Sequence, residues 1–85
     1  MKITLNDMRT AMAMVNYANI NWRGFFSKEE CRQFAKDILT DERTLRTYLN
    51  GIAEDIDISR DNHLYDDVAI DLYNKGNEIL KRMTA

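Results

Sequence analysis

The sequence contains no proline, three glycines, one cysteine and one tryptophan among its 85 residues. Proline and glycine supply most tight turns, so their scarcity disfavours a many-stranded β-protein and leaves little that would interrupt long helices. The lone Cys31 cannot form an internal disulfide, which is typical of a reducing compartment and of a cysteine that is simply buried. These absences favour an all-α fold.

Long apolar runs are absent as well. The longest, Ala11 to Val15, is far shorter than the stretch of about 20 residues that spans a bilayer as a helix. No basic segment followed by an apolar stretch opens the sequence, as it would in a secretory signal. We therefore expect a cytoplasmic protein that does not contact a membrane.

The composition is that of an ordinary globular protein, with 45% hydrophobic and 31% charged residues. Residues 1–85 fit one domain with a thin core. The net charge is −2, but residues 1–53 carry eight Lys/Arg and six Asp/Glu, whereas residues 54–85 carry four and eight. This polarity allows the N-terminal half to meet an anionic partner, although a difference of this size is common in proteins that have none.

The first helix is predicted from Leu5 to about Ala18. Thr4 can cap it, and Asp7 is favourably placed in its first turn. Residues 19–26 break the period, so we expect a loop whose aromatic side chains fold back on the core. Apolar residues recur at three- and four-residue spacing and should form the buried face of this helix: Leu5, Met8, Met12, Val15 and Ala18.

A second helix should begin after Ser27, because Ser27 and Glu30 have the spacing of a capping box, and should end near Leu39. A short third helix, capped by Thr40 or Asp41, follows almost at once. Asn50-Gly51 is expected to end it with a left-handed turn, and residues 52–62 would then be an extended connection. The inward-facing residues of these two helices are predicted to be Cys31, Phe34, Ala35, Ile38, Leu39, Leu45, Tyr48 and Leu49.

The last helix is predicted from about Asn62 to Met83 and should be the longest. Gly76 lies within it, and there it either permits a close helix crossing or marks a bend. The fold we expect is a compact bundle of about four helices. The apolar face of the last helix should consist of Tyr65, Ala69, Leu72, Gly76, Ile79 and Met83, widened by Leu64, Val68 and Leu80.

One segment carries features of a known motif. Ala35 is small enough to let two helices touch, and Leu45, ten places later, would lock them together. At residues 48–51 an aromatic-aliphatic pair precedes Asn-Gly. With these features, residues 34–51 resemble the helix-turn-helix of phage-repressor-like DNA-binding regulators.

The connection within this segment departs from the family pattern. Leu39 stands where the family usually has glycine, and Thr40 where it usually has an aliphatic residue. Asp41 and Glu42 bring negative charge to the end of the helix that would approach phosphates, where it is unfavourable.

The resemblance implies a small, non-enzymatic, DNA-binding transcriptional regulator that acts as a dimer. Arginine can pair with guanine in the major groove, so Arg43 and Arg46 are the expected base-reading residues, supported by Thr47 and Asn50. Lys28, Arg32 and Lys36 would contact phosphates. The competing interpretation is a tight helical hairpin with a solvated charged face.

Other functions stay open. The acidic residues Asp66, Asp67 and Asp71 would suit a module that inhibits or adapts a partner protein, as small phage-type inhibitors and DNA mimics do. A structural subunit that dimerises through the last helix is a third alternative. We expect no catalytic site and no cofactor, because no nucleophile stands beside a base in a motif.

We also expect no metal. A series of oxygen-bearing residues loosely resembles a calcium-binding loop, but arginine stands at the sixth position, where that loop needs glycine, and the chain has only one histidine. This weaker alternative involves Asp55, Asp57, Ser59, Asp61, His63 and Asp66.

Overall fold

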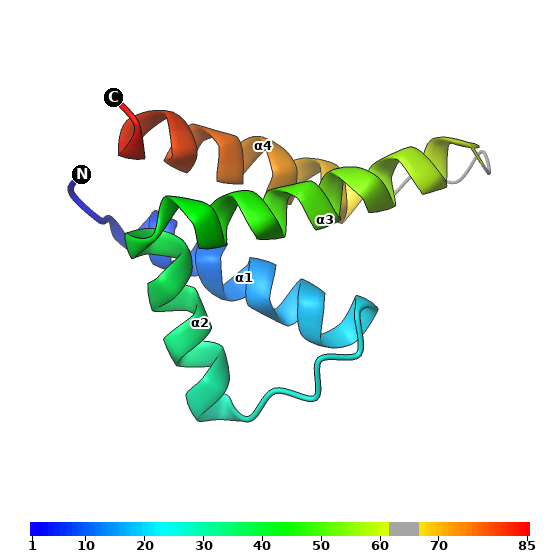
Figure 1. The fold of residues 1–85 in the computed structure, drawn as a ribbon, viewed down its shortest axis with the longest axis horizontal. Coiled ribbons are helices and arrows are strands. Elements are labelled where there is room, and N and C mark those ends of the chain that lie inside the picture. The colour runs from blue at the N-terminus through cyan, green and yellow to red at the C-terminus, as the bar shows by residue number, and fades with distance from the viewer. Residues whose placement is uncertain (62–66) are drawn as a thin grey trace.

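The computed structural model describes residues 1–61 and 67–85, with the side chains of residues 60 and 61 left out. This part of the chain forms four α-helices and no strand: α1 (Leu5–Asn21), α2 (Lys28–Thr40), α3 (Glu42–Asp61) and α4 (Asp67–Met83). In Figure 1, α3 runs alongside α4, and α2 leads away from the start of α3. α1 packs against α2 and also contacts α4. The all-α bundle expected from the sequence is confirmed. None of the described helices is long and apolar enough to cross a membrane.

The helix starts follow the predicted caps. Thr4 and Asp7 form a capping box on α1, in which each backbone amide donates to the side chain of the other residue, at 2.8 and 3.1 Å. Ser27 and Glu30 repeat this arrangement on α2, with both bonds at 3.1 Å. These local hydrogen bonds satisfy backbone amides that have no partner inside the helix, which is why short-range sequence patterns place them correctly.

The predicted inner face of α1 is wrong at its first two turns. Leu5 and Met8 are 62% and 53% exposed, whereas Asp7, Ala11 and Met14 point into the protein. The helix is rotated because its start faces the end of α4, where Asp7 meets a basic side chain. It also runs to Asn21 instead of Ala18.

α3 does not end at Asn50-Gly51, and this corrects the largest error of the sequence interpretation. The helix runs on to Asp61, so residues 52–61 are helical and not an extended connection. None of the described glycines has a positive φ, so Gly51 is no left-handed stop. Ile52 and Ile56 are buried and continue the spacing of the preceding core positions, which gives this part of α3 a face to bury.

Gly76 allows α4 to approach α3 closely. A Cβ atom at this position would lie 2.6 Å from Leu49 Cδ2, so a larger residue could fit only if Leu49 moved. The close-crossing alternative is therefore confirmed.

Two further predictions for α4 are wrong. Val68 is exposed and does not widen the apolar face, and α3, not α4, is the longest described helix. The predictions for Leu64 and Tyr65 lie outside the described residues.

The two ends of the described chain are joined through Asp7. Its Oδ1 accepts a hydrogen bond from the Arg82 guanidinium of α4, and its Oδ2 accepts the Thr4 amide. Burial raises the pKa of Asp7, but the hydrogen bonds from Thr4 and Arg82 and the charge of Arg82 outweigh it, so the pKa lies below its ordinary value of 3.8. The folded state thus favours the ionised carboxylate.

We expect Asp7→Asn to lower the free energy of unfolding by about 2 kcal/mol at pH 7, because the amide cannot replace the charge that Arg82 and Thr4 stabilise. A carboxyl group whose pKa is lowered by folding adds stability above its unfolded pKa. That stability is lost as the pH falls through the folded pKa. Urea unfolding should therefore give a constant difference between wild type and variant above about pH 5 and a shrinking one below about pH 4.

Glu30→Gln is the matched control, because it changes the equivalent carboxylate of the α2 capping box, which is exposed and has no basic partner there. It should cost less stability at pH 7 than Asp7→Asn. A wild-type-minus-Asn difference that does not change below pH 4 would contradict the role given to the Asp7 charge.

Candidate functional site

The junction between α2 and α3 is shorter than the expected turn. α2 ends at Thr40, and Asp41 alone connects the helices, in an extended conformation with φ −129° and ψ 110°. Leu39 is helical and buried, so the position where the resembled family has glycine needs no left-handed backbone. The Asp41 carboxylate accepts the Arg43 amide at 3.1 Å and the Thr44 hydroxyl at 2.9 Å, and so caps α3.

Ala35 and Leu45 occupy the packing positions that the motif assigned to them. They are 6% and 0% exposed, and both belong to the single hydrophobic core cluster. Both residues expected at the helix contact are therefore buried, while the connection between the helices differs from the expected turn.

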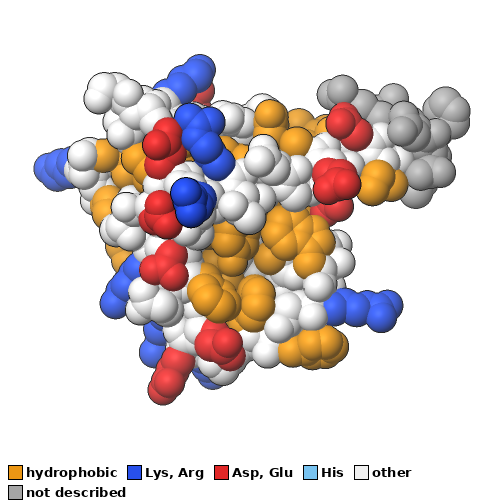
Figure 2. Space-filling model, viewed as in Figure 1, with side chains coloured by type: hydrophobic (Ala, Val, Ile, Leu, Met, Phe, Trp, Pro, Cys, Tyr) orange, Lys and Arg blue, Asp and Glu red, His pale blue; other side chains and the backbone are white. Residues whose placement is uncertain are grey.

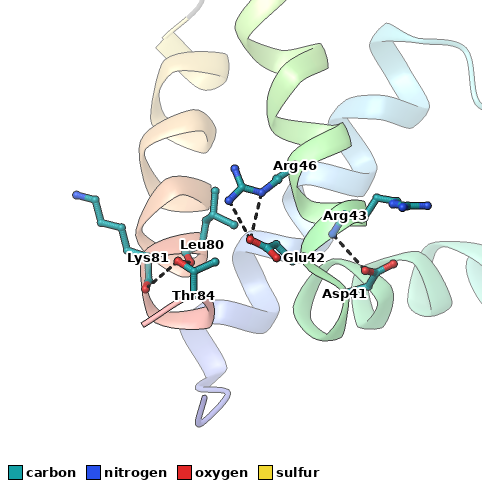
Figure 3. A network of polar contacts seen from close by, with 7 residues as sticks. All are labelled: Asp41, Glu42, Arg43, Arg46, Leu80, Lys81 and Thr84. Carbon is teal, nitrogen blue, oxygen red and sulfur yellow. Dashed lines mark hydrogen bonds and ion pairs between the residues drawn. The ribbon is translucent and has the colours of Figure 1, made fainter.

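The two arginines expected to read bases are exposed but point in different directions. Arg46 donates to Glu42 Oε1 through Nε at 3.2 Å and through one terminal nitrogen at 2.9 Å. Figure 3 shows this pair on the side of α3 that faces Leu80 of α4 and Thr84 just after it, whereas Arg43 extends away from α4. An ion pair this exposed contributes little stability, but it partly neutralises Arg46.

The other expected DNA-contacting residues divide between two surfaces. Thr47 and Asn50 are exposed on α3, and the Thr47 hydroxyl donates to the Arg43 carbonyl at 2.9 Å. Lys28, Arg32 and Lys36 are exposed on α2 at four-residue spacing. Of these, Arg32 and Lys36 line a groove between α2 and α1, away from the α4 side that Arg46 faces.

Two of the three loop aromatics expected to fold back on the core, Trp22 and Phe26, contact other rings of α1, α2 and α3. These rings form two groups. The Trp22 ring centre lies 5.8 Å from that of Tyr17 and 5.9 Å from that of Tyr48, and the Phe26 and Phe34 rings are 4.7 Å apart. Burial raises the pKa of Tyr48, with Cys31 and Asp37 adding to the shift, so its hydroxyl stays neutral. Figure 2 shows hydrophobic side chains reaching the surface between these three helices.

The loop before α2 turns Phe25 outward and Phe26 inward. Arg23 and Phe25 have positive φ values of 51° and 53°, which are unusual for residues other than glycine. Phe26 packs on the core as expected, and its amide donates to the Asn19 side-chain oxygen at 2.8 Å. Phe25 is 87% exposed, so the expectation that it folds back is wrong.

Trp22 explains why glycine stands at position 51. A Cβ atom there would lie 2.6 Å from two atoms of the indole ring, so the ring occupies the space that a side chain would need. One turn further along α3, Asp55 Oδ2 accepts the Trp22 Nε1 hydrogen bond at 2.8 Å and the Tyr17 hydroxyl at 2.7 Å. The indole is thus held against the middle of α3. The sequence did contain one indication that the helix continues past Gly51, namely the uninterrupted helical spacing of Leu49, Ile52 and Ile56.

The helical conformation of residues 55–59 removes the basis of the calcium alternative. Asp55, Asp57 and Ser59 lie in α3 and not in a loop, and the described residues contain no group of three His, Cys, Asp or Glu side chains placed to hold a metal ion. His63, Asp66 and the Asp61 side chain lie outside what the structure describes.

A second groove, of about 530 Å³, lies between α1 and α4. Its lining mixes cations with carboxylates, and two of the cations are already paired, Lys75 with Asp71 and Arg82 with Asp7. The lining includes no cysteine, histidine or serine that could act as a nucleophile or base.

Comparison of the chain with protein-family models, with curated proteins and with solved structures finds no match to any of them.

The packing of Trp22 on Gly51 gives a test by double-mutant cycle. Gly51→Ala should lower the free energy of unfolding by about 1 kcal/mol, because the clash with the rigid ring exceeds the gain in helix propensity. In a Trp22→Ala background the same change should raise it by about 0.5–1 kcal/mol, because only the propensity gain remains. Urea unfolding followed by circular dichroism measures both.

A left-handed helix stop at Gly51 leads to a different result. Alanine would then be strained whether or not Trp22 is present, and Gly51→Ala would destabilise both backgrounds.

Proposed function

We propose that this chain is a small, non-enzymatic protein-interaction module that acts as an inhibitor or adaptor of a partner protein. The observation that carries this proposal is the gathering of exposed, large apolar side chains at the two ends of α1. A small chain with a thin core gains stability from each apolar side chain that it buries. Large apolar side chains that stay exposed together are therefore typical of a surface that binds another protein.

The first group, at the start of α1, includes Leu5 and Met8 together with Met1 and Ile3. The second group, at the end of α1, includes Ile20 and Phe25, which are 77% and 87% exposed. Elsewhere in the described residues, only Ile58 and Val68 are large, apolar and exposed. The exposed apolar surface is therefore concentrated and not scattered over the molecule.

DNA binding is the second candidate, and the exposed face of α3 favours it. Arg43, Thr47 and Asn50 share one side of the helix by their spacing, and all three are exposed. Against it stand Asp41 and Glu42 in the first turn, which repel phosphate. We rank DNA second because the exposed apolar groups have no use in a contact with phosphates.

Affinity capture with the purified, tagged protein tests the proposal. We expect one protein to be recovered in stoichiometric amount. Leu5→Ser/Met8→Ser or Ile20→Ser/Phe25→Ser should abolish that recovery, because each pair removes one exposed apolar group without touching the core. Val68→Ser is the matched control, since it changes an equally exposed apolar residue far from α1 in the sequence, and it should leave the recovery unchanged.

A parallel measurement addresses the second candidate. Binding to mixed-sequence DNA, followed by fluorescence anisotropy across a salt titration, should be negligible at 150 mM salt. Binding that falls steeply with salt and is weakened by Arg43→Ala, together with protein capture insensitive to all three serine variants, would contradict the proposal and support a DNA-binding role.

A further inference from the structure

The strongest unexplained feature is an apolar groove between α1 and α2. It has a volume of about 360 Å³ and is lined by Met8, Met12, Arg32, Ala35, Lys36 and Leu39. The buried side chains of Ala35 and Leu39 form its floor.

One wall of the groove continues an apolar stripe along α1. Leu5, Met8 and Met12 are three and four residues apart and therefore share one face of the helix. This is the face that the sequence predicts to be buried, yet the protein leaves its first two turns exposed. Methionine side chains are flexible and polarizable, and they adapt well to a partner's surface. The stripe thus has the residue spacing of a buried helix face, but no described part of the chain packs over Leu5 and Met8.

The opposite wall is basic. Arg32 and Lys36 come from adjacent turns of α2, and neither takes part in an ion pair within the described residues. The described lining contains no carboxylate that could neutralise them. Their long stems add apolar surface to the wall, while their charged ends stand at its rim.

We propose that this groove binds an amphipathic helix of a partner protein, whose apolar side chains enter the groove and whose acidic side chains pair with Arg32 and Lys36. This inference rests on the proposed protein-interaction function and names the surface and the chemistry of the partner. The stripe from Leu5 to Met12 is exposed at Leu5 and Met8 and half-buried at Met12. It covers about 10 Å, or two helical turns, which suits anchors spaced three and four residues apart.

Charge decides between this occupant and a second copy of the chain. A symmetric dimer through the same groove would bring Arg32 and Lys36 of one copy against those of the other, and like charges across an interface are unfavourable. An acidic helix gains from the same two residues. A basic partner gains nothing from these two residues. A nucleic acid would pair its phosphates with them but offers no apolar side chains for the methionines.

The experiment uses the full chain and a fluorescein-labelled helical peptide of about 18 residues, or five turns, with leucines on one face and glutamates beside them. One matched peptide carries lysine in place of glutamate, and another carries alanine in place of leucine. We expect fluorescence anisotropy to show binding of the acidic leucine peptide at least about tenfold tighter than that of either matched peptide.

Variants of the protein locate the site. Arg32→Glu/Lys36→Glu should weaken binding at least about tenfold. Arg43→Glu/Arg46→Glu alters the net charge equally, but its residues lie outside the groove, and it should leave binding within about twofold of wild type. Met8→Ser should also weaken binding, whereas Val68→Ser should not.

Three results would overturn the inference: equal effects of the two charge reversals, equal binding of the acidic and basic peptides, or a dimer in sedimentation that Met8→Ser dissociates. The last result would assign the groove to a second copy. If Ile20→Ser/Phe25→Ser abolishes protein capture while the groove variants leave it unchanged, the module function stands and only the groove assignment fails. If none of the apolar variants affects capture, the module function fails as well.

Discussion

The packing of the Trp22 indole against Gly51 is the contact on which the arrangement of the first three helices depends. The ring takes the place of a side chain on α3, and Asp55 holds its Nε1 hydrogen bond together with that of Tyr17. α3 therefore stays helical through its only glycine and packs along α4, while Trp22 at the end of α1 contacts its middle. The loop before α2 is fixed by the same ring, because Trp22 is the residue at which α1 gives way to that loop.

The sequence predicts the local features of this fold well. Capping boxes depend on residues three positions apart, and the burial of Ala35 and Leu45 was expected from the resemblance of residues 34–51 to a helix-turn-helix. The errors arise where a distant residue decides. Asn50-Gly51 has the pattern of a helix end, but the helix continues because the indole of Trp22 fills the space beside Gly51. Leu5 has the spacing of a buried residue, but it is exposed because Asp7 turns inward to meet Arg82.

The candidate site was predictable in its residues but not in its geometry. All seven residues expected to contact DNA are exposed, yet Arg32 and Lys36 border an apolar groove, and Arg46 pairs with Glu42 on the side of α4. Helix spacing alone cannot show which face of α2 is covered by α1. The structure that separates these cations also leaves an apolar stripe of α1 uncovered. This stripe favours a protein partner over a nucleic acid.

The most direct test of this account is the backbone of α3 beyond Gly51, measured by NMR chemical shifts and amide hydrogen exchange. The account predicts helical shifts without interruption from Leu45 to Asp57, and slow exchange of the Ile52 and Ile56 amides. Shifts that become extended after Asn50, with fast exchange at Ile52, would contradict it, because the helix would then end at the glycine and the indole would have nothing to pack against.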